Sequence, residues 1–392
     1  MSWREEDRFL LYCCRAEDER AKNKLIGEER KDIDWNYFLK KARENAVSAI
    51  VYFRLNKNKS DFPDIPQEIL EELKSDYYMN ATKNTLLFEE LGRALEAFKK
   101  SGLPVIALKG AALAETAYGN LALRPMTDID LLVRKEDLLR VDEELKRLGY
   151  RASDRSVNDV DFSATYLMTL DYRSHLPNSP SFHIHWHFVN SSIPNESYIR
   201  HIQMEDIWKD AEKAIISDVE TLVMAPHYLL IHLSEHALRV THSLGKLSFL
   251  CDINQAINFY RERLDWERLI KESFKFKLNH MVYFNLYFTS QFLGAKIPER
   301  VLSELRPKRL TLGERVFMNS VSNNNHVRGL SYLVHLAMNE GFFRKMKFVW
   351  RTFFPPREIL AQRSYLPLSQ FSFRHYFLRI NEIFGHLLKI LK

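Results

Sequence analysis

Thr127-Asp128-Ile129-Asp130-Leu131 is the stretch that decides the fold. Its alternation of polar and apolar residues is typical of a β-strand with one buried face. Asp128 and Asp130 are two positions apart, so both carboxylates project from the same face, roughly 6–7 Å apart along the chain. That spacing suits two oxygen ligands for one or two magnesium ions.

A second strand-like run, residues 103–108, lies upstream and ends at Lys109-Gly110-Ala111. Glycine lets the backbone approach a ligand closely, and the helix expected after it would offer its N-terminal N–H groups to a phosphate. Lys109 or Arg124 could neutralise charge on a departing pyrophosphate. A surface ion pair with an acid is the other interpretation of Arg124. Together with the acids, these residues indicate binding of a nucleoside triphosphate.

Two motifs carry a resemblance to a known family. Leu108-Lys109-Gly110-Ala111-Ala112-Leu113, followed by Arg124-Pro125-Met126-Thr127-Asp128-Ile129-Asp130-Leu131-Leu132-Val133, resembles the uncharacterised nucleotidyltransferase family of the DNA polymerase beta superfamily. The similarity covers most of the chain from about residue 30, and includes Asp34-Trp35, Ile184-His185-Trp186 and Leu250-Cys251-Asp252-Ile253. Only the glycine corner and the Asp-x-Asp motif are specific for chemistry.

The resemblance implies a magnesium- or manganese-dependent transfer of a nucleoside monophosphate from a nucleoside triphosphate to an acceptor hydroxyl, with release of pyrophosphate. Asp128 and Asp130 would hold the metal, and Lys109, Gly110, Ala111 and Arg124 would contact the nucleotide. The acceptor stays open: a small molecule, the end of an RNA or a protein side chain all fit.

The chain departs from the family pattern at two positions. The usual Gly-Gly or Gly-Ser corner is Gly110-Ala111 here, and the third carboxylate expected on a neighbouring strand is replaced by His183. Imidazole is a poor magnesium ligand but an acceptable one for manganese or zinc. Three interpretations stay open. His183 is a general base or an unusual ligand, an acid such as Asp171 substitutes, or the protein is a weakened enzyme, at the limit a nucleotide-binding pseudoenzyme or interaction module.

The expected fold class is α+β, with a polymerase-beta-like core of mixed sheet and helices. Apolar spacing predicts an N-terminal helical segment over residues 1–85 and a nucleotidyltransferase core over 86–203. In the core, residues 162–172 and 181–189 are predicted to form an antiparallel strand pair. From about residue 204 to the end, repeated leucine and isoleucine stripes predict helices only, packed as a bundle against the core.

Other polar groups have competing interpretations. His183, His185 and His187 share one face of a predicted strand, which allows a zinc site. The alternative is an exposed or partly packed strand face, with His185 structural beside Trp186. His232-Leu233-Ser234-Glu235-His236 matches the inverted zinc-peptidase pattern, but nothing else in the sequence favours a protease. Lys246 and Asp252 are expected to face the cleft between bundle and core, where Asp252 either orients an acceptor or is a helix-capping or buried paired acid.

Composition limits the remaining classes. The 392 residues are 28% charged and 46% hydrophobic, as in ordinary globular proteins. No apolar run approaches the ~18–20 residues that span a bilayer. The charged start does not resemble a signal peptide. Three cysteines, two of them adjacent, form neither a disulfide framework nor a zinc pattern, so we expect a cytoplasmic protein.

Positive charge is concentrated at the C-terminal end. Residues 341–392 contain ten Lys or Arg and two Glu, a net charge of +8, whereas the whole chain carries +6. Aromatic residues alternate with these cations. Such a segment could contact nucleic acid or an anionic membrane surface. Alternatively, an amphipathic helix buries the aromatics while the basic side chains extend into solvent.

Overall fold

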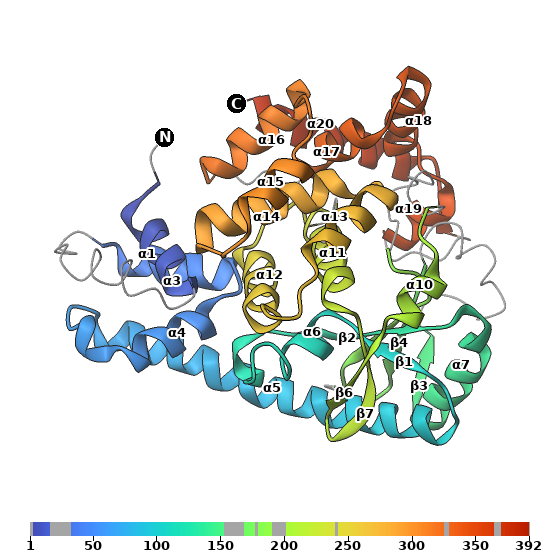
Figure 1. The fold of residues 1–392 in the computed structure, drawn as a ribbon, viewed down its shortest axis with the longest axis horizontal. Helices are drawn as coiled ribbons and strands as arrows, with labels where there is room; N and C mark the ends of the chain where they lie inside the picture. Colours follow the sequence, from blue (N-terminus) through green and yellow to red (C-terminus); the bar gives the residue numbers. More distant parts are fainter. Residues whose placement is uncertain are drawn as a thin grey trace.

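A mixed seven-stranded sheet organises the part of the chain that the computed structural model describes (Figure 1). The described residues are 3–15, 33–152, 168–176, 179–189, 201–239, 242–324, 329–363 and 370–391. The strand order is β3-β4-β5-β2-β1-β7-β6. The strands are β1 Val105–Ala107, β2 Asp128–Val133, β3 Tyr150–Ala152, β4 Thr169–Ser174, β5 Ser181–His185, β6 Glu212–Ile216 and β7 Val219–Val223.

The central strand β2 carries the two aspartates and pairs with β1 on one side and β5 on the other. The β2–β5 pairing is parallel and sets Asp130 opposite His183. The predicted antiparallel pair is found as β4 and β5, although residues 162–167 of its first strand lie outside the described residues. The α+β fold class is therefore confirmed.

A β-hairpin after residue 204 corrects the expectation that this region is entirely helical. β6 and β7 pair with each other, and β7 adds to the sheet in parallel with β1. Ser217 and Asp218 form the turn with φ of 49° and 59°. Such turns usually contain Asn-Gly or Asp-Gly, so Ser-Asp gives only a weak hairpin signal.

Helices cover both faces of the sheet because successive strand residues point to opposite sides. Leu131 and Val133 belong to a core shared with α5 Gln67–Lys100 and α7 Leu138–Arg147. Leu132 belongs to the other core, shared with the helical bundle. By the same alternation, Asp128 and Asp130 face the bundle. α5 is one continuous helix, so it crosses the expected boundary at residue 85.

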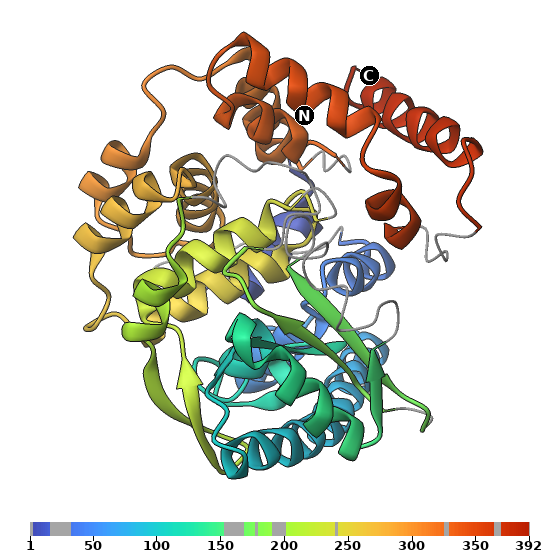
Figure 2. The ribbon, with the colours of Figure 1, turned by 90° about the vertical axis from the view of Figure 1, so that its right-hand side faces the viewer.

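The remaining helices run from α1 near the N-terminus to α20 at the C-terminal end (Figure 2). Those around the N-terminus and the bundle core are α1 Glu5–Cys14, α3 Trp35–Glu44, α4 Ser48–Lys57, α6 Lys109–Leu113, α10 Met204–Lys209, α11 Pro226–Ala237, α12 Leu247–Phe259, α13 Trp266–Lys275 and α14 Asn279–Leu293. The C-terminal ones are α15 Glu299–Leu305, α16 Leu312–Ser322, α17 Ser331–Met338, α18 Phe342–Phe353, α19 Arg357–Arg363 and α20 Arg374–Leu391. None of the helices in the described ranges is long and apolar enough to cross a membrane.

Candidate metal and nucleotide site

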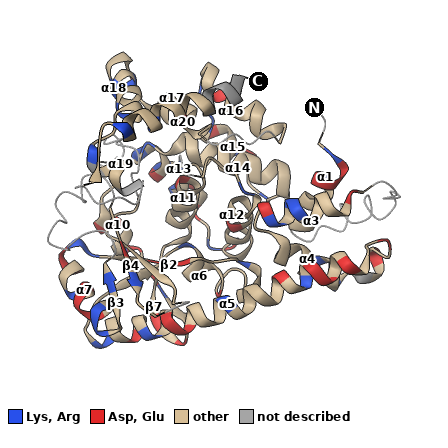
Figure 3. Cartoon of the chain, turned by 180° about the vertical axis from the view of Figure 1, so that it is seen from behind, with Lys and Arg blue, Asp and Glu red and all other residues tan. Residues whose placement is uncertain are grey.

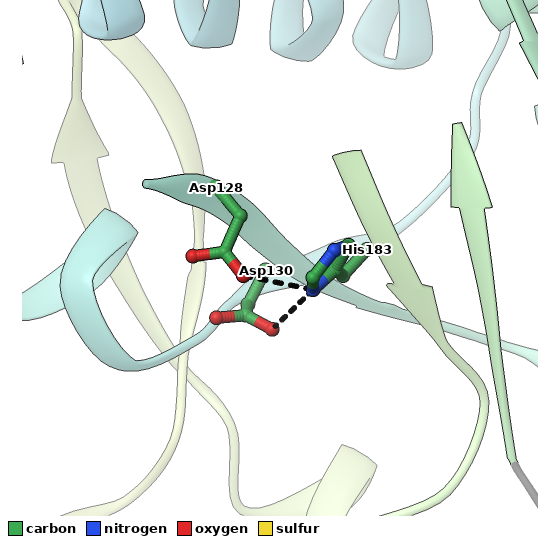
Figure 4. A group of neighbouring side chains, drawn as sticks. All are labelled: Asp128, Asp130 and His183. Atoms are coloured by element: carbon green, nitrogen blue, oxygen red, sulfur yellow. Dashed lines mark ion pairs between the residues drawn. The ribbon is translucent and has the colours of Figure 1, made fainter. Parts of the chain in front are cut away.

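Asp128, Asp130 and His183 meet at the centre of the sheet (Figure 4). One potential ligand atom from each lies within 4.8 Å of the others. His183 Nδ1 is 2.9 Å from Asp128 Oδ2 and 3.8 Å from Asp130 Oδ1. The parallel β2–β5 register produces this meeting, since it puts residue 183 beside the Asp pair. His183 therefore occupies the place where the family pattern led us to expect a carboxylate.

Asp130 is buried, and Lys109 and His185 contact its carboxylate. Lys109 Nζ donates to Asp130 Oδ1 over 2.7 Å, and His185 Nε2 lies 2.8 Å from the same oxygen. Burial alone would raise the pKa of Asp130, but the Lys109 charge and the His185 hydrogen bond hold it well below its usual range. Burial lowers the pKa of His185 to about 4, so its neutral ring donates Nε2–H to the carboxylate.

The corner at Lys109 has an unusual backbone. Lys109 has φ of 45°, a left-handed conformation that costs a residue with a Cβ about 1–2 kcal/mol. The buried ion pair with Asp130 offsets this strain. The helix that follows, α6, has only five residues and starts earlier than the expected helix at residue 111. Lys109, Gly110 and Ala111 are all buried.

The backbone at Gly110 lies close to the side chains of Arg124 and Met126. A Cβ at this position would lie 2.5 Å from Arg124 Nη1 and 2.9 Å from Met126 Cγ, and both are too close. The space that the missing side chain leaves is therefore filled by these two residues. Contact of a triphosphate with Gly110 stays a prediction.

Arg124 and Asp252 form a buried ion pair between the sheet and the bundle. Arg124 Nη2 donates to Asp252 Oδ2 over 2.9 Å and Nε donates to Oδ1 over 3.3 Å. Tyr118 Oη also donates to Asp252 Oδ1, over 2.9 Å. Of the two interpretations of Asp252, the buried paired acid is the one observed. Arg124 is paired as well, with a side chain 17% exposed, so the pair is not a surface one.

His183 carries a positive charge in this arrangement. Burial alone would lower its pKa, but the hydrogen bond to Asp128 and the charges of Asp130 and Asp171 raise it to about 9. Asp171 lies opposite His183 on β4, and its Oδ1 is 3.7 Å from His183 Nε2. Asp171, the other acid considered for the third position, thus lies behind the imidazole instead of replacing it.

A family model described as "Uncharacterised nucleotidyltransferase" matches residues 31–294. The chain belongs to this family. The family assignment confirms the resemblance seen in the two motifs. The structure of this nucleotidyltransferase also has a solved neighbour, "Solution Structure of Antibiotic-Resistance Factor ANT(2'')-Ia Reveals Substrate-Regulated Conformation Dynamics". The two share 13% identity with a TM-score of 0.35, over 53% of this chain and 99% of the other. No curated protein matches the sequence.

The zinc patterns considered from the sequence do not assemble among the described residues. His185 is bonded to Asp130 and lies outside the cluster with metal-site geometry, and His187 Nδ1 accepts from the Val189 backbone N–H. In the possible peptidase pattern, His232 Nδ1 bonds to the Phe188 carbonyl and Glu235 is paired with Arg239. Across the described ranges, Asp128, Asp130 and His183 are the single group of three with metal-site geometry.

Two histidines of the bundle were not predicted to lie near the Asp pair. His236 and His242 have ring centroids 4.6 Å apart. Burial and the positive charges of Arg239 and Lys109 lower the pKa of both, while Asp130 acts on His236 and Asp128 on His242 in the opposite direction. Nδ1 of His236 is buried without a hydrogen-bond partner among the described residues. His236 belongs to the His-x-x-Glu-His pattern, but the spacing between His236 and His242 matches no motif. Only the fold brings both rings close enough for the charges of the Asp pair to act on them.

Proposed function

We propose that this nucleotidyltransferase transfers a nucleoside monophosphate from a nucleoside triphosphate to an acceptor hydroxyl, with a divalent metal ion bound by Asp128 and Asp130. The observation that carries the proposal is the three-residue cluster. Two carboxylates from one strand and an imidazole from the parallel neighbour have ligand atoms within 4.8 Å of one another. The family assignment supports the same reaction class.

The donor set fits a divalent ion. The contacts to Asp130 within the described residues all reach Oδ1. Asp128, Asp130 and His183 Nδ1 would hold the ion, which would supply charge neutralisation and alignment at the phosphates. Asp171 behind Nε2 supports a ligand role for His183, since metal-binding histidines usually direct their second nitrogen to a carboxylate or carbonyl. The single imidazole favours manganese over magnesium.

The protein's own residues prepare the site. Lys109 and His185 keep Asp130 ionised and fixed, so its carboxylate is oriented before a ligand arrives. The Arg124–Asp252 pair connects the glycine corner to α12. Direct contact of Lys109, Gly110, Ala111 and Arg124 with the nucleotide stays a prediction. For Gly110 it requires Arg124 to move.

The acceptor side of the site is proposed to be the bundle. His236 and His242 contribute neutral imidazoles there, and the buried Nδ1 of His236 has an unsatisfied hydrogen-bonding capacity. A hydroxyl-bearing acceptor is suited to such a partner. A small molecule, an RNA end and a protein side chain all carry that hydroxyl.

One observation favours a second candidate, a nucleotide-binding pseudoenzyme. Lys109 and the protonated His183 balance the charges of Asp130 and Asp128, so the cluster is satisfied without a metal ion. An enzyme with a third carboxylate in place of His183 would lack this balance between positive and negative charges. The pseudoenzyme would bind nucleotide without releasing pyrophosphate.

The discriminating experiment is a search for product. The purified protein is incubated with each nucleoside triphosphate, magnesium or manganese, and a cell extract, and mass spectrometry detects nucleotide adducts while a coupled assay follows pyrophosphate. Metal-dependent pyrophosphate release that Asp128→Asn abolishes supports the transferase. Nucleotide binding without any adduct or pyrophosphate, with either metal, assigns the protein to the pseudoenzyme class instead.

A further inference from the structure

The C-terminal helices expose large aromatic side chains. On α18, Phe342, Phe343 and Trp350 are 72%, 86% and 63% exposed. Burying an aromatic side chain of this kind is worth roughly 1.5–3 kcal/mol, so several together on one surface signal a partner. These helices lie at the end of the molecule far from α5 and the sheet (Figure 1).

The exposed residues of α18 form one face. At about 100° per residue, Phe342, Met346 and Trp350 lie on the same side of the helix. Phe348 points the opposite way and packs against Tyr332 and Leu336 of α17. Phe348 thus anchors the helix on α17, whereas Phe342, Phe343 and Trp350 point outward. The expectation that this segment buries its aromatics holds for Phe348 and not for the exposed face.

α20 extends the same surface. Phe373, just before the helix, is 89% exposed, and Phe377 and Phe384 within it are 66% and 53% exposed. The Phe353 and Phe384 rings have centroids 6.0 Å apart, which joins α18 to α20. We call the exposed aromatic and aliphatic residues of this region the C-terminal face: Phe342, Phe343, Met346, Trp350, Phe354, Phe373, Phe377, Leu378 and Phe384.

Basic side chains flank the C-terminal face. Arg344, Lys345, Lys347 and Arg351 alternate with the aromatics of α18. By helical spacing Lys345 lies at one edge of the exposed stripe and Lys347 at the other, whereas Arg344 and Arg351 lie further round, toward the Phe348 side. Figure 3 shows these cations on α18. The net charge of +8 over residues 341–392 makes this the basic end of the protein.

We infer that the C-terminal face docks on the surface of an anionic lipid bilayer. Amphipathic helices that lie in the membrane interface combine a stripe of Trp, Phe and Leu with Lys and Arg at its edges, as α18 does. The apolar stripe enters the headgroup boundary, and the cations pair with anionic lipids. Each Lys or Arg near such a surface strengthens binding by roughly fivefold. The candidate metal site, in the sheet, would remain on the side away from the bilayer.

The charge pattern favours a bilayer over a second copy of this chain. Two copies meeting through the C-terminal face would bring the two sets of cations together, which is unfavourable. Nucleic acid would pair with the cations. However, Met346 and Leu378, which lie beside the aromatic rings, have aliphatic side chains on which a base cannot stack. An anionic bilayer accepts both the charges and the aliphatic residues.

The test is co-sedimentation of the full chain with lipid vesicles. Vesicles of phosphatidylcholine alone are compared with vesicles that also contain phosphatidylglycerol. The expected result is binding that requires phosphatidylglycerol and falls when salt is raised. Phe343→Glu with Trp350→Glu should lower the partition coefficient at least about tenfold, and Arg344→Glu with Lys345→Glu should do the same. The matched control is Leu139→Glu on α7, also an exposed apolar residue, at 59%, which should bind like the wild type.

Three results would overturn the inference. The first is equal sedimentation with both vesicle types or with neither. The second is tight, salt-dependent binding of RNA or DNA that the same two pairs of substitutions abolish while vesicle binding is unchanged. The third is a dimer in sedimentation velocity that Phe343→Glu with Trp350→Glu dissociates. The charge-reversal pair leaves the aromatics in place, so it keeps the test decisive even if the aromatic variant folds poorly.

Discussion

His183 Nδ1 lies 2.9 Å from Asp128 Oδ2, in a pair formed across two parallel strands. A carboxylate at residue 183 would repel Asp128 and Asp130 and would need a cation to hold the three acids together. An imidazole attracts them instead. The substitution thus changes both the charge of the cluster and its dependence on metal.

The first prediction concerns metal preference. His183→Glu should add a negative oxygen ligand and strengthen magnesium binding at least about tenfold, because magnesium prefers oxygen. The wild type should bind manganese more tightly than magnesium. Calorimetric titration of each metal, with and without a nucleoside triphosphate, measures both. If His183→Glu leaves the magnesium affinity unchanged, residue 183 is not in the coordination sphere.

His183→Ala separates a ligand from a bystander. Removal of a true ligand should weaken manganese binding clearly, whereas a bystander should cost much less than Asp130→Ala does. If His183→Glu destroys a magnesium-supported turnover that the wild type has, the histidine has a catalytic role of its own. The description of His183 as a replaced carboxylate ligand would then be wrong.

The second prediction is that substitutions of the two aspartates lower the unfolding free energy by different amounts. Asp130→Asn leaves the Lys109 ammonium buried without its charged partner, which should cost about 3 kcal/mol of unfolding free energy. Asp128 has a side chain 29% exposed, so Asp128→Asn should cost far less. Urea denaturation of the metal-free proteins measures both values. Equal losses for the two variants would show that breaking the buried Lys109–Asp130 pair is not the reason for the lost unfolding free energy.

A double variant tests the cause. Lys109→Met together with Asp130→Asn leaves no buried charge, so most of the lost stability should return. If the double variant is as unstable as Asp130→Asn alone, packing and not charge explains the loss. This coupling also makes Asp128→Asn the cleaner substitution for metal-binding experiments.

The third prediction concerns Gly110. Gly110→Ala places a Cβ against Arg124 and Met126, and overpacking of this kind costs about 1–3 kcal/mol. The melting temperature should fall without any ligand present. Gly385→Ala in α20 is the control, because nothing lies within 4 Å of its added Cβ. An unchanged melting temperature with weakened nucleotide binding would support our original expectation of a phosphate lying against this glycine.

Local patterns were sufficient for the centre of the site. The alternation around Asp128 and Asp130 predicts the strand and the shared face, and the family pattern points to residue 183 as the third position. Both signals lie within short stretches of chain. The structure adds the pairing of β2 with β5, which brings His183 beside the aspartates.

The other parts of the site and of the fold depend on contacts between residues far apart in the sequence. The spacing of apolar residues along the chain does not encode such contacts. Arg124 and Asp252 are 128 positions apart, and nothing near either of them specifies the other. The β6–β7 hairpin has no glycine in its turn, so the sequence does not mark the turn. Its two short apolar stretches therefore resemble the ends of helices. His185 illustrates a third case. The sequence allowed a structural role for it beside Trp186, but its bond to Asp130 follows from the strand register that also places His183.

The last prediction concerns protons released on metal binding. The pKa of His183 is raised to about 9, so at pH 7 both ring nitrogens of His183 are protonated in the metal-free protein. A metal ion on Nδ1 must displace the proton that this nitrogen donates to Asp128. Binding at pH 7 should therefore release about one proton, and the apparent manganese affinity should rise by up to about tenfold per pH unit until the pH passes the pKa of His183.

Calorimetry in buffers of different ionisation enthalpy counts these protons, and His183→Ala provides the comparison. The variant should release markedly fewer protons and lose most of the pH dependence between pH 7 and the pKa of about 9. Asp128 and Asp130 do not supply the difference, because the pKa of each is lowered below its ordinary acidic value and both are already ionised at pH 7. A wild type that binds manganese at pH 7 with no proton release would show that His183 keeps its proton and its bond to Asp128. The ion would then be held by the aspartates without it.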